Sequence, residues 1–227
     1  MTWIKICGMT NLEDAQAAAD AGANAVGFVF YNKSPRNVDL ETVKNITAKL
    51  PPRLEKIGVF VHGANAGMEK IAREAGLTGV QVHADPTVNG HPPEPQLPPQ
   101  FKRYLALPGK LFFGKKGEGL KYFLPRGKRT DAIFLDSSTE QLPGGTGEVF
   151  DWSQAAPTVG LIGRMIPIVV AGGLTPENVT DAIGILSPWG VDVSSGVEAS
   201  PGKKDPEKVH AFIQAVRNHA VRTIENN

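Results

Sequence analysis

Two reactive side chains stand where apolar, strand-like runs of this 227-residue sequence end. Cys7 closes the run 3–7, and Asp136 follows the run 131–135. A thiol can serve as a base or a nucleophile and a carboxyl group as an acid, so the pair could supply acid–base chemistry. Lys5 shares a strand face with Cys7, because side chains alternate along a strand, and its positive charge would favour the thiolate.

Each of the two residues also has a plain structural interpretation. Free cysteine commonly behaves as a small buried apolar side chain, and an aspartate after a strand commonly caps the next loop through backbone amides. Spacing alone leaves both interpretations open for Cys7 and for Asp136. What favours a functional Cys7 is Gly8, which follows it directly and marks the exit of the strand.

Two glycine-bearing turns near the end of the chain have the composition of an anion site. The first, at Gly172 and Gly173, joins a continuously apolar run to a Thr-Pro pair that typically starts a helix; the second, at 194–196, follows the run 190–193. Free amide groups and the positive dipole at a helix N-terminus attract phosphate. The first turn alone could equally be an ordinary connection, but a second turn of the same design favours a shared phosphate site.

Three further polar side chains fall at or just after strand ends. Arg36 lies in the loop after the second strand-like run, and its planar guanidinium would suit a bidentate grip on a carboxylate, although it could equally be a solvated loop residue. His83 could bind a metal only with other ligands nearby, and the sequence has no cluster at ligand spacing, so a positioning or core role fits better. Asp192, with Ser195 shortly after it, ends the last strand.

Strand-like and helical runs alternate along most of the chain, an order that predicts parallel strand–helix–strand units. The expected strands span 3–7, 25–30, 56–61, 80–83, 103–107, 131–135, 167–171 and 190–193. The expected helices span 12–21, 39–50, 68–75, 151–164, 176–186 and 205–223. We therefore expect an α/β fold: a (β/α)8 TIM barrel forming a single domain over 1–227, with its active site at the C-terminal ends of the strands.

The middle of the chain departs from this order. Residues 85–100 contain six prolines and little apolar periodicity, so an irregular connection is expected there in place of a regular fourth helix. Residues 109–129 are rich in glycine and basic residues and are interpreted as a solvated loop. The fourth and fifth helical connections of the barrel are therefore expected to be irregular.

Composition excludes several classes of function. The formal net charge is +1, so the chain lacks the excess of basic residues that is typical of proteins that bind nucleic acid or a membrane surface. No apolar stretch approaches the length of a membrane span, and the N-terminus enters a strand pattern without the apolar region of a signal peptide. The single cysteine cannot form an internal disulfide, which fits a cytoplasmic protein.

Motifs along nearly the whole chain resemble those of the phosphoribosylanthranilate isomerase family of tryptophan biosynthesis. The resemblance is weakest over 84–129, where Ala84 stands in place of the family's usual glycine. The matching segments are Lys5–Asp14, Ala25–Tyr31, Ser34–Arg36, Val59–Val61, Val80–His83, Leu135–Ser137, Gly144–Gly147, Phe150–Trp152, Ala171–Asn178, Val191–Glu198 and Pro201–Asp205.

This resemblance implies an Amadori rearrangement of N-(5-phosphoribosyl)anthranilate without a cofactor or a metal. By motif position, Asp136 is the general acid that opens the furanose, Cys7 is the base that takes the C2 proton, and Arg36 holds the anthranilate carboxylate. The resemblance also implies a small-molecule substrate, with no nucleic-acid or membrane partner; monomer and homodimer both remain open. The expected substrate-binding residues are Arg36, His83, Gly173, Asp192, Ser195 and Gly196.

Three alternatives use the same barrel differently. An aminoaldose isomerase of histidine biosynthesis is expected to carry a carboxylate at the end of the first strand, where this chain has Cys7. A metal-dependent pentose-phosphate epimerase needs clustered ligands that the sequence lacks. A non-catalytic barrel that senses a phosphorylated metabolite would require neither an acid nor a base.

Overall fold

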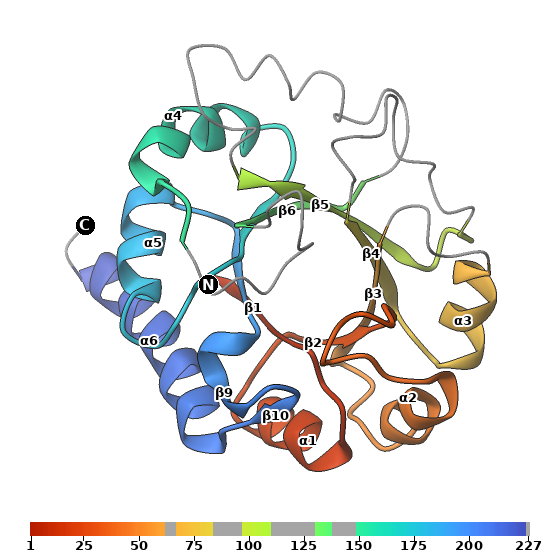
Figure 1. Ribbon diagram of the computed structural model, residues 1–227. Coiled ribbons are helices and arrows are strands. Elements are labelled where there is room, and N and C mark those ends of the chain that lie inside the picture. Colours follow the sequence, from red (N-terminus) through yellow and green to blue (C-terminus); the bar gives the residue numbers. More distant parts are fainter. Residues whose placement is uncertain (62–66, 84–96, 110–129, 138–148, 226–227) are drawn as a thin grey trace.

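Eight parallel strands form a closed barrel in chain order (Figure 1). The computed structural model describes residues 1–61, 67–83, 97–109, 130–137 and 149–225. The barrel strands are β1 (Trp3–Cys7), β2 (Ala25–Val29), β3 (Glu55–Val61), β4 (Gly79–His83), β5 (Lys102–Pro108), β6 (Ala132–Asp136), β7 (Ile168–Val170) and β8 (Gly190–Val193). Because β8 pairs with β1, all eight C-terminal ends meet at one rim, and the predicted TIM barrel is confirmed.

Helices surround the barrel in Figure 1, as parallel strand–helix–strand connections require. They are α1 (Leu12–Asp20), α2 (Leu40–Thr47), α3 (Met68–Glu74), α4 (Trp152–Ile162), α5 (Val179–Leu186) and α6 (Pro206–Glu225). After β8 come a 3-10 turn, η3 (Ser195–Val197), and a small hairpin of β9 (Glu198–Ser200) and β10 (Lys203–Lys204). No helix in the described part of the chain is long and apolar enough to cross a membrane.

Most helix boundaries lie within two residues of the positions expected from the sequence. Asn11, Asp39 and Asp151 each accept a hydrogen bond from a backbone amide of the first turn, at α1, α2 and α4 respectively. Such caps satisfy amides that have no partner within the helix. The strands begin and end within two residues of their expected positions, because continuous apolar runs identify buried parallel strands well.

Two expectations about the elements need correction. The helix expected from Pro176 begins at Val179, and Pro176 to Asn178 form a separate turn. The Asn178 side chain accepts from the Thr175 amide at 2.8 Å and donates to the Gly173 carbonyl at 2.9 Å, so it holds this turn in its own shape. The β9–β10 hairpin was not expected at all. The irregular connections expected at 85–100 and 109–129 fall largely outside the described residues.

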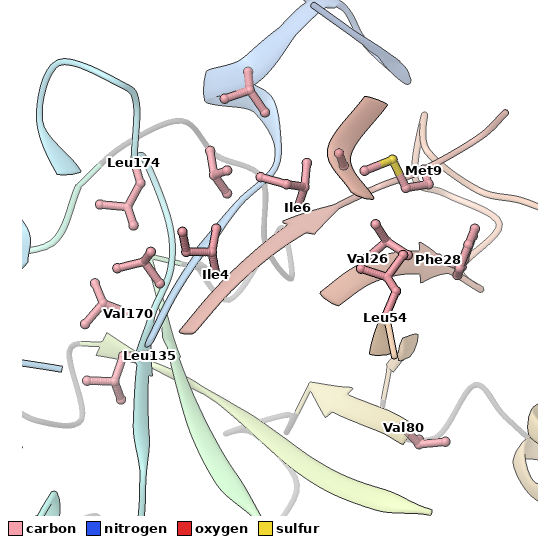
Figure 2. Packing of buried hydrophobic residues seen from close by; sticks show 14 of the residues in the cluster. Ile4, Ile6, Met9, Val26, Phe28, Leu54, Val80, Leu135, Val170 and Leu174 are labelled. Carbon is pink, nitrogen blue, oxygen red and sulfur yellow. The ribbon is translucent and has the colours of Figure 1, made fainter. Parts of the chain in front are cut away.

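The barrel has an outer and an inner apolar layer. The outer layer lies between the strands and the helices and includes Ile4 and Ile6 of β1, whose side chains Figure 2 shows among other apolar groups. The inner layer fills the barrel itself with a smaller cluster that includes Trp3, also from β1. The predicted alternation along β1 is confirmed, with the isoleucines packed toward the helices and the odd-numbered side chains inside.

Aromatic rings close one end of the barrel interior. Trp3, Tyr104 and Phe134 contact one another with ring centroids 5.5–6.3 Å apart. Further along the same strands, toward their C-terminal ends, the inward side chains become polar: Lys5 follows Trp3, and Asp136 follows Phe134. The polar part of the barrel interior therefore lies toward the C-terminal rim, above an apolar floor.

Candidate active site

One pocket at the C-terminal rim brings together most of the residues that the sequence singled out. It is lined by side chains and backbone from β1, β4, β6 and β8 and from the turns that follow β2, β7 and β8. Gly196 is the one expected site residue that does not line it, although its neighbour in the chain does. The expected residues on the pocket wall are Cys7, Arg36, His83, Asp136, Gly173, Asp192 and Ser195.

Lys5 and Asp192 form a buried ion pair beneath the pocket. The two residues are register partners on the adjacent strands β1 and β8. The Lys5 ammonium lies 3.0 Å from each carboxylate oxygen of Asp192, and the Lys5 side chain is fully buried. Both carboxylate oxygens of Asp192 accept from Lys5, so the contact that the structure shows for Asp192 is with Lys5. A direct contact of Asp192 with the substrate remains a prediction.

Cys7 sits directly above Lys5 on the same strand face. A Cβ atom at Gly27 on β2 would lie 2.7 Å from the Cys7 sulfur and 2.9 Å from Cε of Lys5, so this glycine makes room for both side chains. Burial raises the pKa of the Cys7 thiol, and the Lys5 ammonium offsets only part of that increase. The expected influence of Lys5 is therefore present, but burial outweighs it, and the pKa of the thiol is raised overall.

Asp136 lies at the end of β6 and is almost completely buried. The next residue, Ser137, packs against the first glycine turn: a Cβ atom at Gly172 would overlap the Ser137 amide nitrogen and Oγ. This contact joins the strand that carries the carboxyl group to the turn expected to hold phosphate. Cys7 and Asp136 come from β1 and β6, which lie on different sides of the barrel, and both face the same pocket.

His83 is a neutral imidazole in this pocket. Burial lowers its pKa from 6.5 to about 4, with a further contribution from the Lys5 charge. Its Nε2 atom lies 3.3 Å from Nε2 of Gln81, an amide nitrogen that only donates, so His83 accepts there and carries its proton on Nδ1. The sequence-based preference for a positioning histidine agrees with this geometry, since His83 packs among side chains that fix its orientation.

Sequence reasoning missed the partners of Arg36. Nε and Nη2 of Arg36 donate to the two oxygens of Glu198 at 2.8 Å each, and Lys204 donates to Glu198 at 2.9 Å. The Glu198 and Lys204 side chains are 5% and 1% exposed, so this is a buried cluster and not a solvated loop. Both residues stand in motif segments of the sequence, but nothing in their spacing indicates that a hairpin folds them against Arg36.

The two glycine turns touch each other backbone to backbone. Gly172 and Gly173 have φ angles of +81° and +64°, a region that glycine adopts readily, and they turn the chain sharply after β7. A Cβ atom at Gly196 would overlap the carbonyl oxygen of Leu174 in the first turn. The expected proximity of the two turns is therefore present.

The residues that the structure describes include no evident set of ligands for a metal ion. No group of three or more His, Cys, Asp or Glu side chains within these ranges is arranged to hold a metal ion. Two of the buried carboxylates near the pocket are engaged by cationic side chains, Asp192 by Lys5 and Glu198 by Arg36 and Lys204. That the reaction needs no metal or cofactor remains a prediction from the sequence.

Comparisons with known proteins agree on one family. The family model described as N-(5'-phosphoribosyl)anthranilate (PRA) isomerase matches residues 4–215. The chain is similar to N-(5'-phosphoribosyl)anthranilate isomerase of Pseudomonas fluorescens (strain Pf0-1), with 42% identity over 213 residues that cover 94% of this chain and 97% of the relative.

Two solved structures are similar in fold and sequence. One, monomers generated from a dimeric phosphoribosylanthranilate isomerase of Thermotoga maritima, has a TM-score of 0.75 and 34% identity and covers 96% of this chain and 100% of its own. The other is a phosphoribosylanthranilate isomerase in complex with reduced 1-(o-carboxyphenylamino)-1-deoxyribulose 5-phosphate, with a TM-score of 0.73, 34% identity and the same coverage.

The fold and the pocket define a (β/α)8-barrel protein with a carboxyl group, a thiol and two glycine turns at the C-terminal ends of its strands. Within that class, the chain belongs to the N-(5'-phosphoribosyl)anthranilate isomerase family. It is an isomerase of tryptophan biosynthesis that acts on a small phosphosugar substrate.

Proposed function

We propose that Cys7 and Asp136 are the base and the acid of this isomerisation. The observation that carries the proposal is that the two side chains, from strands far apart in the chain, face one pocket whose rim holds the two glycine turns. The remaining roles follow from where the substrate's two charged ends can bind. The phosphate meets the turns after β7 and β8, and the anthranilate carboxylate meets Arg36.

The first step is opening of the furanose ring. Asp136, in its protonated form, donates its proton to the ring oxygen of N-(5-phosphoribosyl)anthranilate. The bond between C1 and that oxygen breaks, and the nitrogen lone pair forms a Schiff base with C1. The place of Asp136 on the pocket wall at the end of β6 supports this role, because a general acid must lie within reach of the atom that it protonates.

The second step is proton removal from C2. The Cys7 thiolate takes the proton, and the C–H electron pair forms a double bond between C1 and C2 while the Schiff base becomes an amine. The resulting enol tautomerises to the aminoketose product: water takes its hydroxyl proton and supplies the proton at C1. Proton exchange with water then returns Asp136 to its acid form and Cys7 to the thiolate. No electron enters or leaves the substrate, so the reaction is an internal redox exchange between C1 and C2.

The phosphate binds largely to backbone amides at Gly173, Ser195 and Gly196. Contact between the turns supports this assignment, since the amides that follow β7 and β8 converge on one region of the rim. His83 and Asp192 line the pocket between the phosphate and the reacting carbons, and His83 can donate through Nδ1 to a substrate oxygen.

We further propose that the whole chain forms one barrel domain and works as a monomer or a homodimer in the cytoplasm. The Thermotoga maritima relative is described as dimeric, and monomers of it have been crystallised, so either state is compatible with this fold. Nucleic acid and membranes are not expected as partners, in keeping with the formal net charge of +1.

A steady-state assay with freshly prepared N-(5-phosphoribosyl)anthranilate, followed by anthranilate fluorescence, tests these roles. Cys7→Ser and Asp136→Asn should each lower kcat by about a hundredfold or more while product affinity changes little. Asp20→Asn, the same chemical change at an exposed position ending α1, should behave as the unmodified enzyme. Near-normal turnover in either site variant would remove that residue from its role, and an inactive unmodified enzyme would refute the function.

A further inference from the structure

We propose that Glu198 and Lys204 are positioning residues that set Arg36 to bind the aromatic carboxylate of the substrate with its outer edge. The inference rests on the proposed function, which places that carboxylate at Arg36. It concerns two residues that make no contact with the reacting atoms, and it assigns each a separate task. Glu198 fixes the plane and direction of the guanidinium, and Lys204 supplies the charge that keeps the site attractive to an anion.

The geometry of the Arg36–Glu198 pair leaves one edge of the guanidinium available. A guanidinium has five N–H groups, and Glu198 engages only Nε and one hydrogen of Nη2, at 2.8 Å each. The edge formed by Nη1 and the second Nη2 hydrogen can still pair with a carboxylate through two parallel hydrogen bonds. Arg36 lines the pocket, so a planar benzoate in the pocket can meet this edge.

The position of Arg36 is fixed on its other side by the end of β1. A Cβ atom at Gly8 would lie 2.6 Å from Cδ of Arg36 and 2.9 Å from Oγ of Ser194. The arginine stem therefore crosses the chain immediately after Cys7, where only a glycine leaves room for it. Ser194 donates to the Cys7 carbonyl at 3.1 Å, and Lys204 donates to the Ser194 carbonyl at 3.1 Å. These contacts fix the position of the Arg36 guanidinium relative to Cys7.

Lys204 determines the net charge of the cluster. Arg36 and Glu198 alone form a neutral pair, which offers an incoming anion little net attraction. With Lys204 at 2.9 Å from Glu198, the three side chains carry one net positive charge, which the substrate carboxylate would neutralise. Burial alone would raise the pKa of Glu198, but hydrogen bonds from Arg36 and Lys204 outweigh it, so Glu198 stays ionised. Asp14 accepts from the Lys204 backbone amide at 2.7 Å and anchors the hairpin.

The test compares two stable ligands: the reduced product analogue, 1-(o-carboxyphenylamino)-1-deoxyribulose 5-phosphate in reduced form, and its counterpart without the carboxyl group. Calorimetry should show that the unmodified enzyme prefers the carboxylated ligand by about tenfold or more, the size expected for charge-assisted hydrogen bonds. Glu198→Gln should reduce this preference to about twofold, with the affinity for the carboxyl-free ligand nearly unchanged. In turnover, KM for the substrate should rise by about tenfold while kcat changes much less.

Two further variants keep the result decisive. Glu55→Gln makes the same change in an ion-paired carboxylate at the beginning of β3 and should keep the unmodified preference. If Glu198→Gln fails to bind even the carboxyl-free ligand, Arg36→Lys decides, because a lysine keeps the charge but has no second planar edge, and it should lose the preference.

The outcomes separate this inference from the proposed function. A Glu198→Gln variant that folds and keeps the unmodified preference overturns the inference, as does an Arg36→Lys variant that keeps it. An unmodified enzyme that turns over phosphoribosylanthranilate but binds both ligands equally also overturns it, while leaving the proposed function intact. Failure of the unmodified enzyme to turn over that substrate would instead remove the proposed function.

Discussion

At the scale of single residues, the site is organised by charges that act on a buried thiol. Cys7 feels the Lys5 ammonium, which lowers its pKa, and the Asp192 carboxylate, which raises it, while burial raises it most. Lys5 itself stays charged, because Asp192 and Cys7 outweigh the burial that would lower its pKa. The ion pair thus gives Cys7, the proposed base, a positive neighbour whose charge is itself paired with Asp192, its register partner on β8.

The charges around Cys7 predict opposite effects of two substitutions on the pH dependence of activity. If the Cys7 thiolate is the base, as proposed, kcat/KM should rise as pH rises through the pKa of Cys7. Lys5→Met removes the charge that lowers this pKa and should move the rise to higher pH by about one unit or more. Asp192→Asn removes a charge that raises the pKa and should move it to lower pH. The pH profile of kcat/KM and the rate of thiol alkylation by iodoacetamide measure both shifts.

A lysine at the other end of the barrel provides the control for this pair of variants. Lys102→Met breaks the ion pair with Glu55 at the beginning of β5 and should leave the profile in place. Shifts of Lys5→Met and Asp192→Asn in the same direction would mean that a general disturbance of the pocket, and not charge, controls the thiol.

The sequence predicts which residues line the pocket better than it predicts their partners. Cys7 and Asp136 could be found because each ends an apolar run, and strand ends meet at one rim in a parallel barrel. The sequence did not indicate that Glu198 pairs with Arg36, because 162 positions separate them. The β9–β10 hairpin that brings Glu198 to Arg36 has no strong signal in the local sequence. Electrostatics of a buried site depend on such distant contacts, so the raised pKa of the Cys7 thiol also required the structure.

At the scale of elements, the proposed phosphate site depends on two turns that pack without side chains between them. Gly196 at the start of η3 meets the Leu174 carbonyl, and Gly172 meets Ser137 after β6. Three loops of the rim are therefore in direct backbone contact. Such contacts fix the direction of amide groups more firmly than flexible side chains could, which suits a site that must bind a phosphate in one place.

Adding one methyl group between the turns should open the phosphate site. The Cβ atom of Gly196→Ala would overlap the Leu174 carbonyl oxygen and lie 2.9 Å from the Leu174 carbonyl carbon, so one turn must move. We expect KM to rise by about tenfold or more and product affinity to fall in parallel, because amides that no longer converge lose hydrogen bonds to phosphate. Steady-state kinetics and calorimetry with the product measure both quantities.

Gly184 in α5 offers a matched control, since nothing lies within 4 Å of a Cβ atom built there. Gly184→Ala should leave KM unchanged and raise the stability slightly, by about 1 kcal/mol at most, as alanine favours a helix over glycine. A Gly196→Ala variant that matches Gly184→Ala in KM would show that the contact between the turns has no part in phosphate binding.

Element boundaries show what local patterns can and cannot determine. The apolar runs and the side-chain caps at Asn11, Asp39 and Asp151 identify strands and helix starts, because both signals act within a few residues. The late start of α5 escaped prediction because Asn178 bonds backward to Gly173 and Thr175, a closure that a Thr-Pro start signal does not reveal. Local sequence signals thus locate a helix, while the hydrogen bonds of a side chain such as Asn178 decide at which residue its first turn begins.

At the scale of the whole molecule, the apolar floor, the buried ion pair and the pocket follow one another along the barrel axis. Aromatic rings at one end, including Trp3 and Phe134, close the interior, and the ion pair of Lys5 and Asp192 lies between this floor and the pocket. Lys5 Nζ lies 5.3 Å from the centroid of the Phe134 ring, so the charged layer rests directly on the aromatic one. Groups of the site are therefore part of the core, and their ionisation contributes to the stability of the fold.

His83 makes that link measurable, because it is buried in its neutral form. Its pKa is about 4 in the folded protein, against 6.5 for an unperturbed histidine. Between these two values the unfolded chain binds a proton that the folded protein does not, so acid favours unfolding. The free energy of unfolding should therefore fall as pH drops through 6.5, by about 3 kcal/mol in total once pH reaches 4.

Replacing His83 by glutamine should remove this contribution, since glutamine does not titrate and can still bond to Gln81. Urea unfolding at a series of pH values from 7 to 4 should show a steeper loss of stability in the unmodified protein than in His83→Gln. His210→Gln makes the same change at an exposed position of α6 and should follow the unmodified protein. Parallel curves for the unmodified protein and His83→Gln would mean that the imidazole can take up its proton inside the folded barrel, so that the pocket reaches solvent more freely than its burial indicates.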